Sequence, residues 1–138
     1  MSTTKLNIEA TIDAPVTKVW EYYNDPERIT EWNSASDDWH TPSSKNDLRV
    51  GGSFSHRMEA RDGSQGFDFE GTYDEVVEPK KIAYTMADGR QATVDFEDLG
   101  GSTRVAVAFD PENESPLDFQ QQGWQGILDE FKKYTEAN

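Results

Sequence analysis

The sequence contains no cysteine and only two histidines, His40 and His56, in 138 residues. Without cysteine the chain can form no disulfide, use no thiolate nucleophile and hold no cysteine-based zinc or iron–sulfur site. Two histidines sixteen positions apart on separate segments do not supply a dedicated metal site either. We therefore expect neither metal binding nor thiol chemistry.

Long apolar runs are also missing. No segment approaches the roughly 20 consecutive apolar residues that cross a bilayer, and the N-terminus lacks a basic region followed by an apolar stretch. We expect a soluble, cytoplasmic protein that is a monomer. A chain of 138 residues fits one domain, residues 1–138.

Positive charge is scarce, because 13 Lys and Arg stand against 27 Asp and Glu, for a formal net charge of −14. Nucleic-acid affinity comes largely from Lys and Arg at phosphates, so we expect no binding to DNA or RNA. The basic residues are scattered, which argues against a patch for anionic membranes. A solvated acidic surface is the simplest explanation, and adaptation to high salt is the alternative.

Catalytic motifs are missing as well. The serines lack a Gly-x-Ser-x-Gly elbow, and Gly51-Gly52 opens a strand instead of a helix, so there is no phosphate loop. Paired carboxylates could do acid and base work. However, alternation places the candidate acids on the outward face, in water. These acids are Asp68, Glu70, Asp95 and Glu97. We expect no catalytic residue and no cofactor.

What the sequence does contain is a period of two in its apolar residues, which begins near Asn46 and persists almost to Asp110. This alternation predicts strands with one buried face. Aromatic residues make up 12% of the chain against 34% for all hydrophobic residues, so the buried wall is bulky. The inward positions of the first two of these strands are Phe54, His56, Met58 and Ala60, followed by Phe67, Phe69, Gly71 and Tyr73.

The remaining elements follow from similar patterns. A strand is predicted over residues 6–12, then a helix after Pro15 and a second short helix capped by Asp25. Strands over residues 81–87, 92–96 and 103–109 complete an antiparallel meander. The pair Asp88-Gly89 predicts a type I′ hairpin turn.

A long terminal helix is predicted to begin with Ser115 as its N-cap and Pro116 at its first position. Polar residues such as Gln121, Gln125 and Glu136 are expected to fill the rest of its surface. The helix is long enough to cover the concave side of the sheet. Its apolar stripe consists of Trp124, Ile127, Leu128, Phe131 and Thr135.

Two glycines, Gly123 and Gly126, interrupt this helix beside Trp124. Each costs about 1 kcal/mol relative to alanine. One explanation, which we favour, is a close approach of the helix backbone to the sheet. The alternative is that the missing side chains leave room for a ligand.

The order of motifs along the chain resembles the START-like, Bet v 1-like (SRPBCC) superfamily, and within it the AHSA1 branch, which is named after the C-terminal domain of the activator of Hsp90 ATPase. The resemblance extends from about Leu6 to Tyr134. The residues that carry it are Trp20, Asp25-Pro26-Glu27, Trp32, Asp47-Leu48-Arg49-Val50-Gly51-Gly52, Met58, Asp62-Gly63, Gly71, Glu78-Pro79, Thr93-Val94-Asp95-Phe96-Glu97 and Gly123-Trp124.

This resemblance implies an α+β helix-grip fold, in which a curved antiparallel sheet of about seven strands wraps around a long C-terminal helix. Two short helices lie between strands 1 and 2. The fold encloses a hydrophobic cavity that holds lipids, sterols, polyketides or plant phenolics in various branches. Here Asn33 and Ser34 replace an aromatic residue that follows Trp32 in many relatives, which implies a more polar cavity mouth, and Trp39 is positioned to replace the missing ring.

We therefore predict that a hydrophobic small molecule, lipid-like or polyketide or phenolic, binds between the sheet and the terminal helix. His56, the one titratable inward group, is either a hydrogen-bonded core residue or a ligand-orienting one. Arg90 is expected to be solvent-exposed, with pairing to a ligand carboxylate as the alternative. The predicted lining is Trp32, Trp39, Phe54, His56, Met58, Phe67, Phe69, Tyr84, Phe96, Trp124 and Leu128.

Two other functions stay open. The family resemblance implies an Hsp90-type chaperone as a possible partner, although the sequence shows no large apolar stripe for such an interface. A cavity enzyme, such as a cyclase or hydrolase, is supported only by analogy between folds.

Overall fold

The computed structural model describes residues 5–34, 37–112 and 116–138. The elements follow the order strand, two helices, six strands, helix. No helix in the described ranges is long and apolar enough to cross a membrane. The bounds are β1 Leu6–Ile12, α1 Val16–Asn24, α2 Pro26–Trp32, β2 Trp39–Asn46, β3 Ser53–Ala60, β4 Gly66–Val77, β5 Lys81–Met86, β6 Gln91–Asp98, β7 Thr103–Phe109 and α3 Leu117–Ala137.

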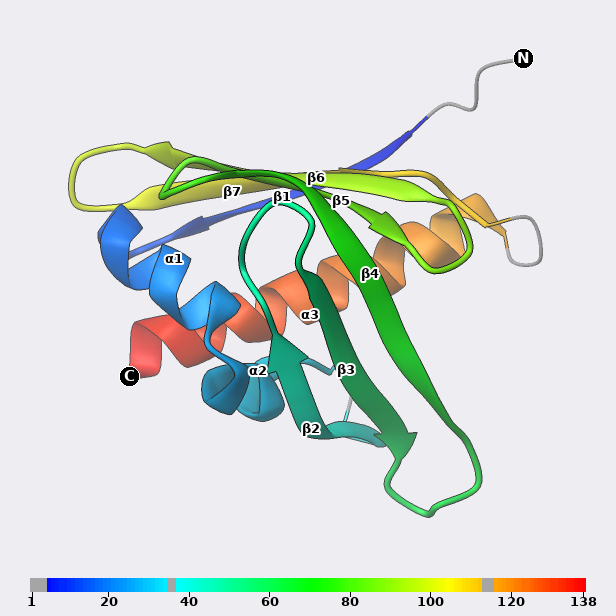
Figure 1. The fold of residues 1–138 in the computed structure, drawn as a ribbon. Coiled ribbons are helices and arrows are strands. Elements are labelled where there is room, and N and C mark those ends of the chain that lie inside the picture. The colour runs from blue at the N-terminus through cyan, green and yellow to red at the C-terminus, as the bar shows by residue number, and fades with distance from the viewer. Residues whose placement is uncertain (1–4, 35–36, 113–115) are drawn as a thin grey trace.

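The seven strands form one antiparallel sheet in the order β1-β7-β6-β5-β4-β3-β2. The sheet curls around α3, which lies across its concave side (Figure 1). This arrangement confirms the predicted helix-grip fold with two short helices between the first two strands. The alternation also holds, because side chains such as Ile82, Val94 and Val107 are buried while Asp95 and Glu97 face water.

Strand β2 is the element that the apolar period does not predict. It forms the edge of the sheet and pairs only with β3. Its register shifts between His40 and Ser43, on either side of Pro42. Proline donates no ladder hydrogen bond, and it is tolerated in an edge strand at a bulge. The bulge breaks the alternation, so the segment has no clear period.

The turn between β5 and β6 also differs from the prediction. A type I′ turn needs positive φ at both Asp88 and Gly89. Gly89 has φ +92°, but no non-glycine residue in the described ranges has positive φ. Hydrogen bonds from Gly89 N to Met86 O, 2.9 Å, and from Met86 N to Arg90 O, 2.7 Å, close a three-residue loop. The hairpin is present, but its turn is of type I followed by a glycine bulge.

Helix α3 is fastened to the free edge of β1. The side-chain amides of Gln121 and Gln125 donate to the carbonyls of Asn7, 2.8 Å, and Glu9, 3.0 Å. These contacts satisfy backbone groups that an edge strand leaves unpaired. The two glutamines, which the sequence pattern places among the solvent-facing residues, therefore hold the helix to the sheet. Pro116 is the N-cap of α3 and not, as predicted, its first residue, because the helix begins at Leu117. The predicted N-cap, Ser115, lies outside the described residues.

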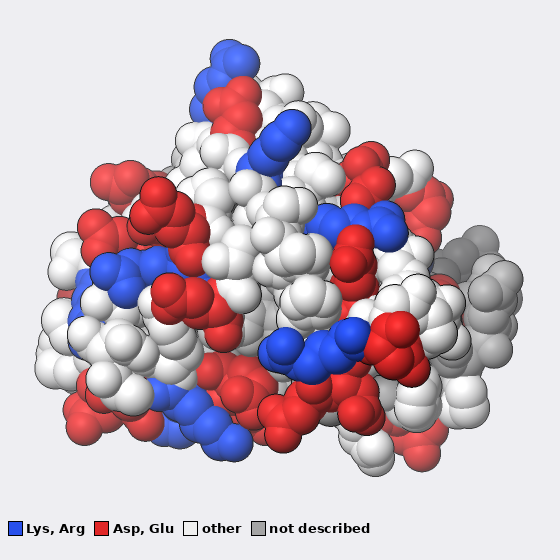
Figure 2. Space-filling model, turned by 90° about the horizontal axis from the view of Figure 1, so that it is seen from below, with Lys and Arg blue, Asp and Glu red and all other residues white. Residues whose placement is uncertain are grey.

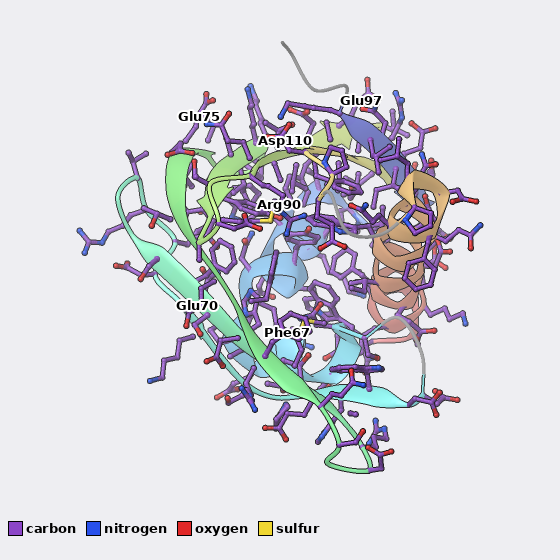
Figure 3. The ribbon with its side chains drawn as sticks, turned by 90° about the vertical axis from the view of Figure 1, so that its right-hand side faces the viewer. Phe67, Glu70, Glu75, Arg90, Glu97 and Asp110 are labelled. Carbon is purple, nitrogen blue, oxygen red and sulfur yellow. The ribbon has the colours of Figure 1, made fainter. Side chains whose placement is uncertain are left out.

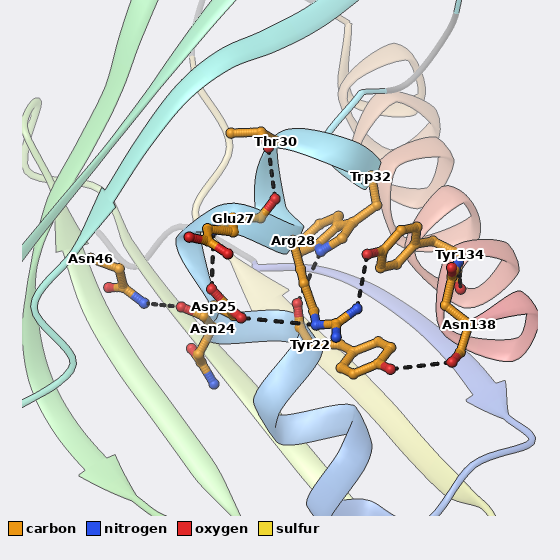
Figure 4. Close-up of polar contacts among 10 residues, drawn as sticks. All are labelled: Tyr22, Asn24, Asp25, Glu27, Arg28, Thr30, Trp32, Asn46, Tyr134 and Asn138. Atoms are coloured by element: carbon orange, nitrogen blue, oxygen red, sulfur yellow. Dashed lines mark hydrogen bonds and ion pairs between the residues drawn. The ribbon is translucent and has the colours of Figure 1, made fainter.

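The other end of α3 is fastened to α1 and α2 (Figure 4). The guanidinium of Arg28 lies 3.7 Å from the ring centre of Tyr22 and donates to the hydroxyl of Tyr134 at 3.1 Å. The Tyr22 hydroxyl donates to the carbonyl of Asn138 at 3.3 Å. Asp25 caps α2 as predicted, accepting from the backbone N–H of Glu27. The three helices thus form one unit that closes this end of the sheet's concave side.

Candidate functional site

A cavity of about 410 Å³ lies between the sheet and α3. Ten of its lining residues carry aromatic rings, if the imidazole is included. Such a volume, with mostly apolar walls and few polar groups, is typical of small-molecule sites. The lining residues are Ile8, Tyr23, Asn24, Ile29, Trp32, Asn33, Asn46, Phe54, His56, Met58, Phe67, Phe69, Tyr73, Ile82, Tyr84, Arg90, Val107, Glu112, Phe119, Gln120, Gly123, Trp124, Ile127 and Leu128.

Nine of the predicted site residues line this cavity, and two do not. Phe96 points inward from β6, but its ring packs at 5.1 Å from Trp20 and 5.4 Å from Tyr23, beneath α1. Trp39 lies outside the lining, with its ring 6.1 Å from that of Phe67. Alternation identifies the buried face of a strand, but it does not show which part of that face a helix covers. The nine are Trp32, Phe54, His56, Met58, Phe67, Phe69, Tyr84, Trp124 and Leu128.

The aromatic wall is built from rings on both layers. Phe54 on β3 meets Tyr84 on β5 at 5.0 Å, edge to face. On α3, Trp124 stacks on Phe109 at 3.9 Å with nearly parallel planes, and its other neighbour Phe69 stands edge-on at 6.1 Å. Each of these rings is fixed by another, so the cavity walls are preorganised.

His56 is a neutral polar group in this wall. Its Nδ1 lies 2.8 Å from the hydroxyl oxygen of Ser44 on the paired strand. Burial lowers the pKa of His56 to about 4, because the apolar surroundings disfavour the charged imidazolium. Ser44 does not line the cavity. The pair therefore orients the imidazole and does not present a hydroxyl nucleophile to the cavity.

Three tyrosines add hydroxyl groups. Tyr73 donates to the side-chain oxygen of Asn46 at 2.5 Å. The hydroxyls of Tyr23 and Tyr84 have no hydrogen-bond partner among the residues that the structure describes. Burial raises the pKa of each of the three phenols, and neighbouring phenols add to the increase for Tyr73 and Tyr84. All three stay protonated at neutral pH and able to donate.

Gly123 faces the cavity. A Cβ atom at this position would have no neighbour within 4 Å, and the residue lines the cavity beside Trp124. A close approach of the backbone to the sheet is therefore the wrong explanation for Gly123. The structure favours the alternative, in which the missing side chain leaves open volume.

The mouth of the cavity combines aromatic and charged groups. Phe67 on β4 and Phe119 on α3 line the cavity and are 47% and 68% exposed. Arg90, on the hairpin between β5 and β6, projects into the space between sheet and helix, whereas Glu70 and Glu75 stand on the outer side (Figure 3). Arg90 is thus half-buried at the site instead of free in solvent.

Several lining residues were absent from the predicted set. Two of them could have been predicted from the sequence. The strand alternation places Tyr73 on the buried face, and the helix stripe does the same for Tyr23. Arg90 begins the inward register of its strand, but its place beside the Asp88-Gly89 turn favoured solvent exposure in the prediction. Phe119 carried no signal, since it stands near the start of a helix. Within the described ranges, no cluster of three or more His, Asp or Glu side chains is arranged to hold a metal ion.

The acidic residues are dispersed over the surface. On the face seen in Figure 2, acidic side chains alternate with lysines and arginines around uncharged areas. Arg57, for example, pairs with Glu59 at 2.8 Å and with Asp68 at 3.6 Å. Exposed pairs of this kind contribute little to stability, because water and salt screen them.

Comparison with known proteins identifies the family. Residues 13–136 match the family described as Activator of Hsp90 ATPase homolog 1-like protein. No curated protein matches the chain. The solution structure of the AHSA1-like protein from Aeromonas hydrophila is 50% identical, with a TM-score of 0.90, over 96% of this chain and 92% of that one.

Two further structures agree. A protein from Cytophaga hutchinsonii is 46% identical, with a TM-score of 0.84, over 97% of this chain and 93% of that one. A protein from Chromobacterium violaceum is 21% identical with a TM-score of 0.84, covering 97% and 99%, and supports the fold alone. The chain therefore belongs to the AHSA1 family of the START-like, Bet v 1-like superfamily.

Proposed function

We propose that this protein binds a hydrophobic small molecule in the cavity between the sheet and α3. The observation that carries the proposal is a volume of about 410 Å³ lined by fixed aromatic rings and by tyrosine hydroxyls without partners in the described ranges. Buried hydroxyls normally have hydrogen-bond partners, because an unsatisfied polar group costs about 1–3 kcal/mol. A ligand with polar atoms on an apolar body would both fill the volume and satisfy these groups.

Gly123 provides the test. Replacing it with phenylalanine would place a ring in the open volume, whereas alanine adds only one methyl group. We expect Gly123→Phe to weaken binding of the neutral fluorescent probe N-phenylnaphthylamine by about tenfold or more, a change of roughly 1.4 kcal/mol. Gly123→Ala should bind the probe within about threefold of the parent protein. It should also be up to about 1 kcal/mol more stable, because alanine is favoured over glycine inside a helix.

Fluorescence titration measures the affinity of each variant, and urea denaturation measures its stability. A Gly123→Phe protein that is folded and binds the probe as tightly as the parent would contradict the proposal. Failure of the parent protein itself to bind the probe would do so as well.

A second candidate function is an Hsp90 co-chaperone-like interaction. Besides the family relationship, one observation favours it. Leu117 and Phe119 at the start of α3 are 56% and 68% exposed, although the sequence shows no long apolar stripe. Large exposed apolar side chains are suited to contact a protein partner.

The matching test measures the ATPase rate of the cognate Hsp90 with and without this protein. If the chaperone is a partner, the rate should rise at least about twofold, and Leu117→Asp with Phe119→Asp should abolish the increase by burying unpaired charges. An unchanged rate with the parent protein would exclude this function. A cytoplasmic location, predicted from the sequence, is consistent with both candidates and is part of the proposal.

A further inference from the structure

We infer that the cavity selects an electrically neutral molecule that carries oxygen atoms on an apolar body, and discriminates against the carboxylate and ammonium forms of the same scaffold. This inference rests on the proposed function and names the chemical class of its ligand. It follows from three features: the interior lining, two tyrosine hydroxyls that have no partner among the described residues, and the arrangement of charges at the mouth.

The interior offers no charged partner. Of the described lining residues, only Arg90 and Glu112 carry a formal charge at neutral pH, and both belong to the mouth. His56 is uncharged, because its pKa is about 4. Moving an ionised ligand group from water into such surroundings costs several kcal/mol unless a counter-charge meets it. A neutral ligand avoids this cost.

The hydroxyls of Tyr23 and Tyr84 favour a ligand that carries oxygen atoms. Tyr84 lies on β5 and Tyr23 on α1, so two tyrosines from different elements line the cavity. Neither hydroxyl has a partner in the described ranges. A ligand carbonyl, ester or phenol oxygen can accept a hydrogen bond from such a donor. A purely hydrocarbon ligand would leave both hydroxyls buried and unsatisfied, which costs affinity.

Arg90 is the one group that could favour a carboxylate, but its guanidinium is already engaged. Its Nε donates to the carboxylate of Asp88 at 2.7 Å, and its Nη1 lies 3.5 Å from the backbone carbonyl of Asp110. The Asp110 carboxylate, which pairs with Lys5 at 2.8 Å, and the Glu112 side chain add further negative charge. Three acids thus stand against two basic residues at the mouth. The chain as a whole carries −14, which also disfavours an approaching anion.

The experiment compares four probes on one scaffold by isothermal titration calorimetry at neutral pH. These are methylnaphthalene, methyl naphthoate, naphthoate and naphthylmethylammonium. We expect the ester to bind most tightly. The carboxylate and the ammonium should bind at least about tenfold more weakly than the ester, because neither charge finds a free partner inside. The affinity of the hydrocarbon should lie between that of the ester and those of the two charged probes. It should be about threefold to tenfold weaker than that of the ester, because the hydrocarbon accepts no hydrogen bond.

Two variants separate the contributions. Replacing both Tyr23 and Tyr84 with phenylalanine removes the two hydroxyls that have no partner in the described ranges, so it should remove most of the difference between ester and hydrocarbon. Arg90→Gln should leave naphthoate a weaker ligand than the ester, because the guanidinium is neutralised by Asp88.

Each outcome has a defined meaning. Binding of naphthoate or the ammonium as tight as that of the ester would overturn the inference, and a loss of naphthoate binding in Arg90→Gln would show that the arginine is an anion receptor. An ester that binds no better than methylnaphthalene would overturn the requirement for oxygen. If none of the four probes binds, and N-phenylnaphthylamine also fails, the proposed function itself is wrong.

Discussion

Replacing Gly71 with alanine is expected to lower the free energy of unfolding by about 2–3 kcal/mol. Gly71 is buried on β4, directly opposite Phe54 in the register. A Cβ atom there would lie 2.7 Å from two ring atoms of Phe54 and 2.8 Å from the backbone carbonyl oxygen of Thr85. The ring cannot simply move aside, because it packs against Tyr73 and Tyr84. The strand must shift as well, so the cost includes strain in the backbone.

Gly101→Ala is the matched control. A Cβ atom at this position has no neighbour within 4 Å, and the residue has no positive φ. Urea denaturation of both variants should therefore show a change of less than about 0.5 kcal/mol for Gly101→Ala. Equal stabilities of the two variants would show that the contact between Gly71 and Phe54 does not restrict this position. Because Phe54 lines the cavity, we also expect Gly71→Ala to weaken probe binding.

Replacing Phe131 with alanine is expected to cost about 3–5 kcal/mol of stability, the usual range for a fully buried phenylalanine. Phe131 is 0% exposed on α3. Its ring lies 4.8 Å from that of Trp32 on α2 and 5.1 Å from that of Tyr23 on α1, in edge-to-face geometry. Phe131 therefore contacts both of the other helices. Its removal leaves a cavity that could be filled only if all three helices moved closer together.

Phe119→Ala is the control, because it removes the same side chain from the same helix at a site that is 68% exposed. Its effect on stability should be below about 0.5 kcal/mol. Thermal or urea denaturation monitored by circular dichroism compares the two. A loss below about 1 kcal/mol for Phe131→Ala would mean that the terminal helix is held mainly by its polar contacts with β1 and Arg28.

Much of the fold could be predicted from local patterns. The period of two identifies six strands and their buried faces, because each side chain's direction follows from its position along the strand. The stripe from Trp124 to Thr135 likewise identifies the buried face of α3. Strand β2 was not predicted, because Pro42 and the bulge beside it interrupt the apolar period. The turn at Gly89 was assigned to the wrong type because two turn types accept the same residues at these positions.

The candidate site was predictable only in part. Inward-facing residues such as Phe54 and Phe69 could be identified, but the boundary of the cavity could not. Phe96 is inward-facing and yet packs under α1. Arg90 begins the inward register of its strand, but its place beside a turn favoured solvent exposure, whereas the structure places it in the cavity lining. These differences depend on where the helices lie over the sheet, which is a property of packing between distant segments.

The sequence by itself determined six of the seven described strands, the helices and the inward face of each, because those properties depend on neighbours within a few positions. It also determined the acidic character and the lack of cysteine chemistry. The tertiary structure decided that α3 follows the edge of β1, held by Gln121 and Gln125. It also decided that the volume beside Gly123 stays open and that Tyr23 and Tyr84 converge on it. These features arise from contacts between residues as many as about 116 positions apart, which no local pattern encodes.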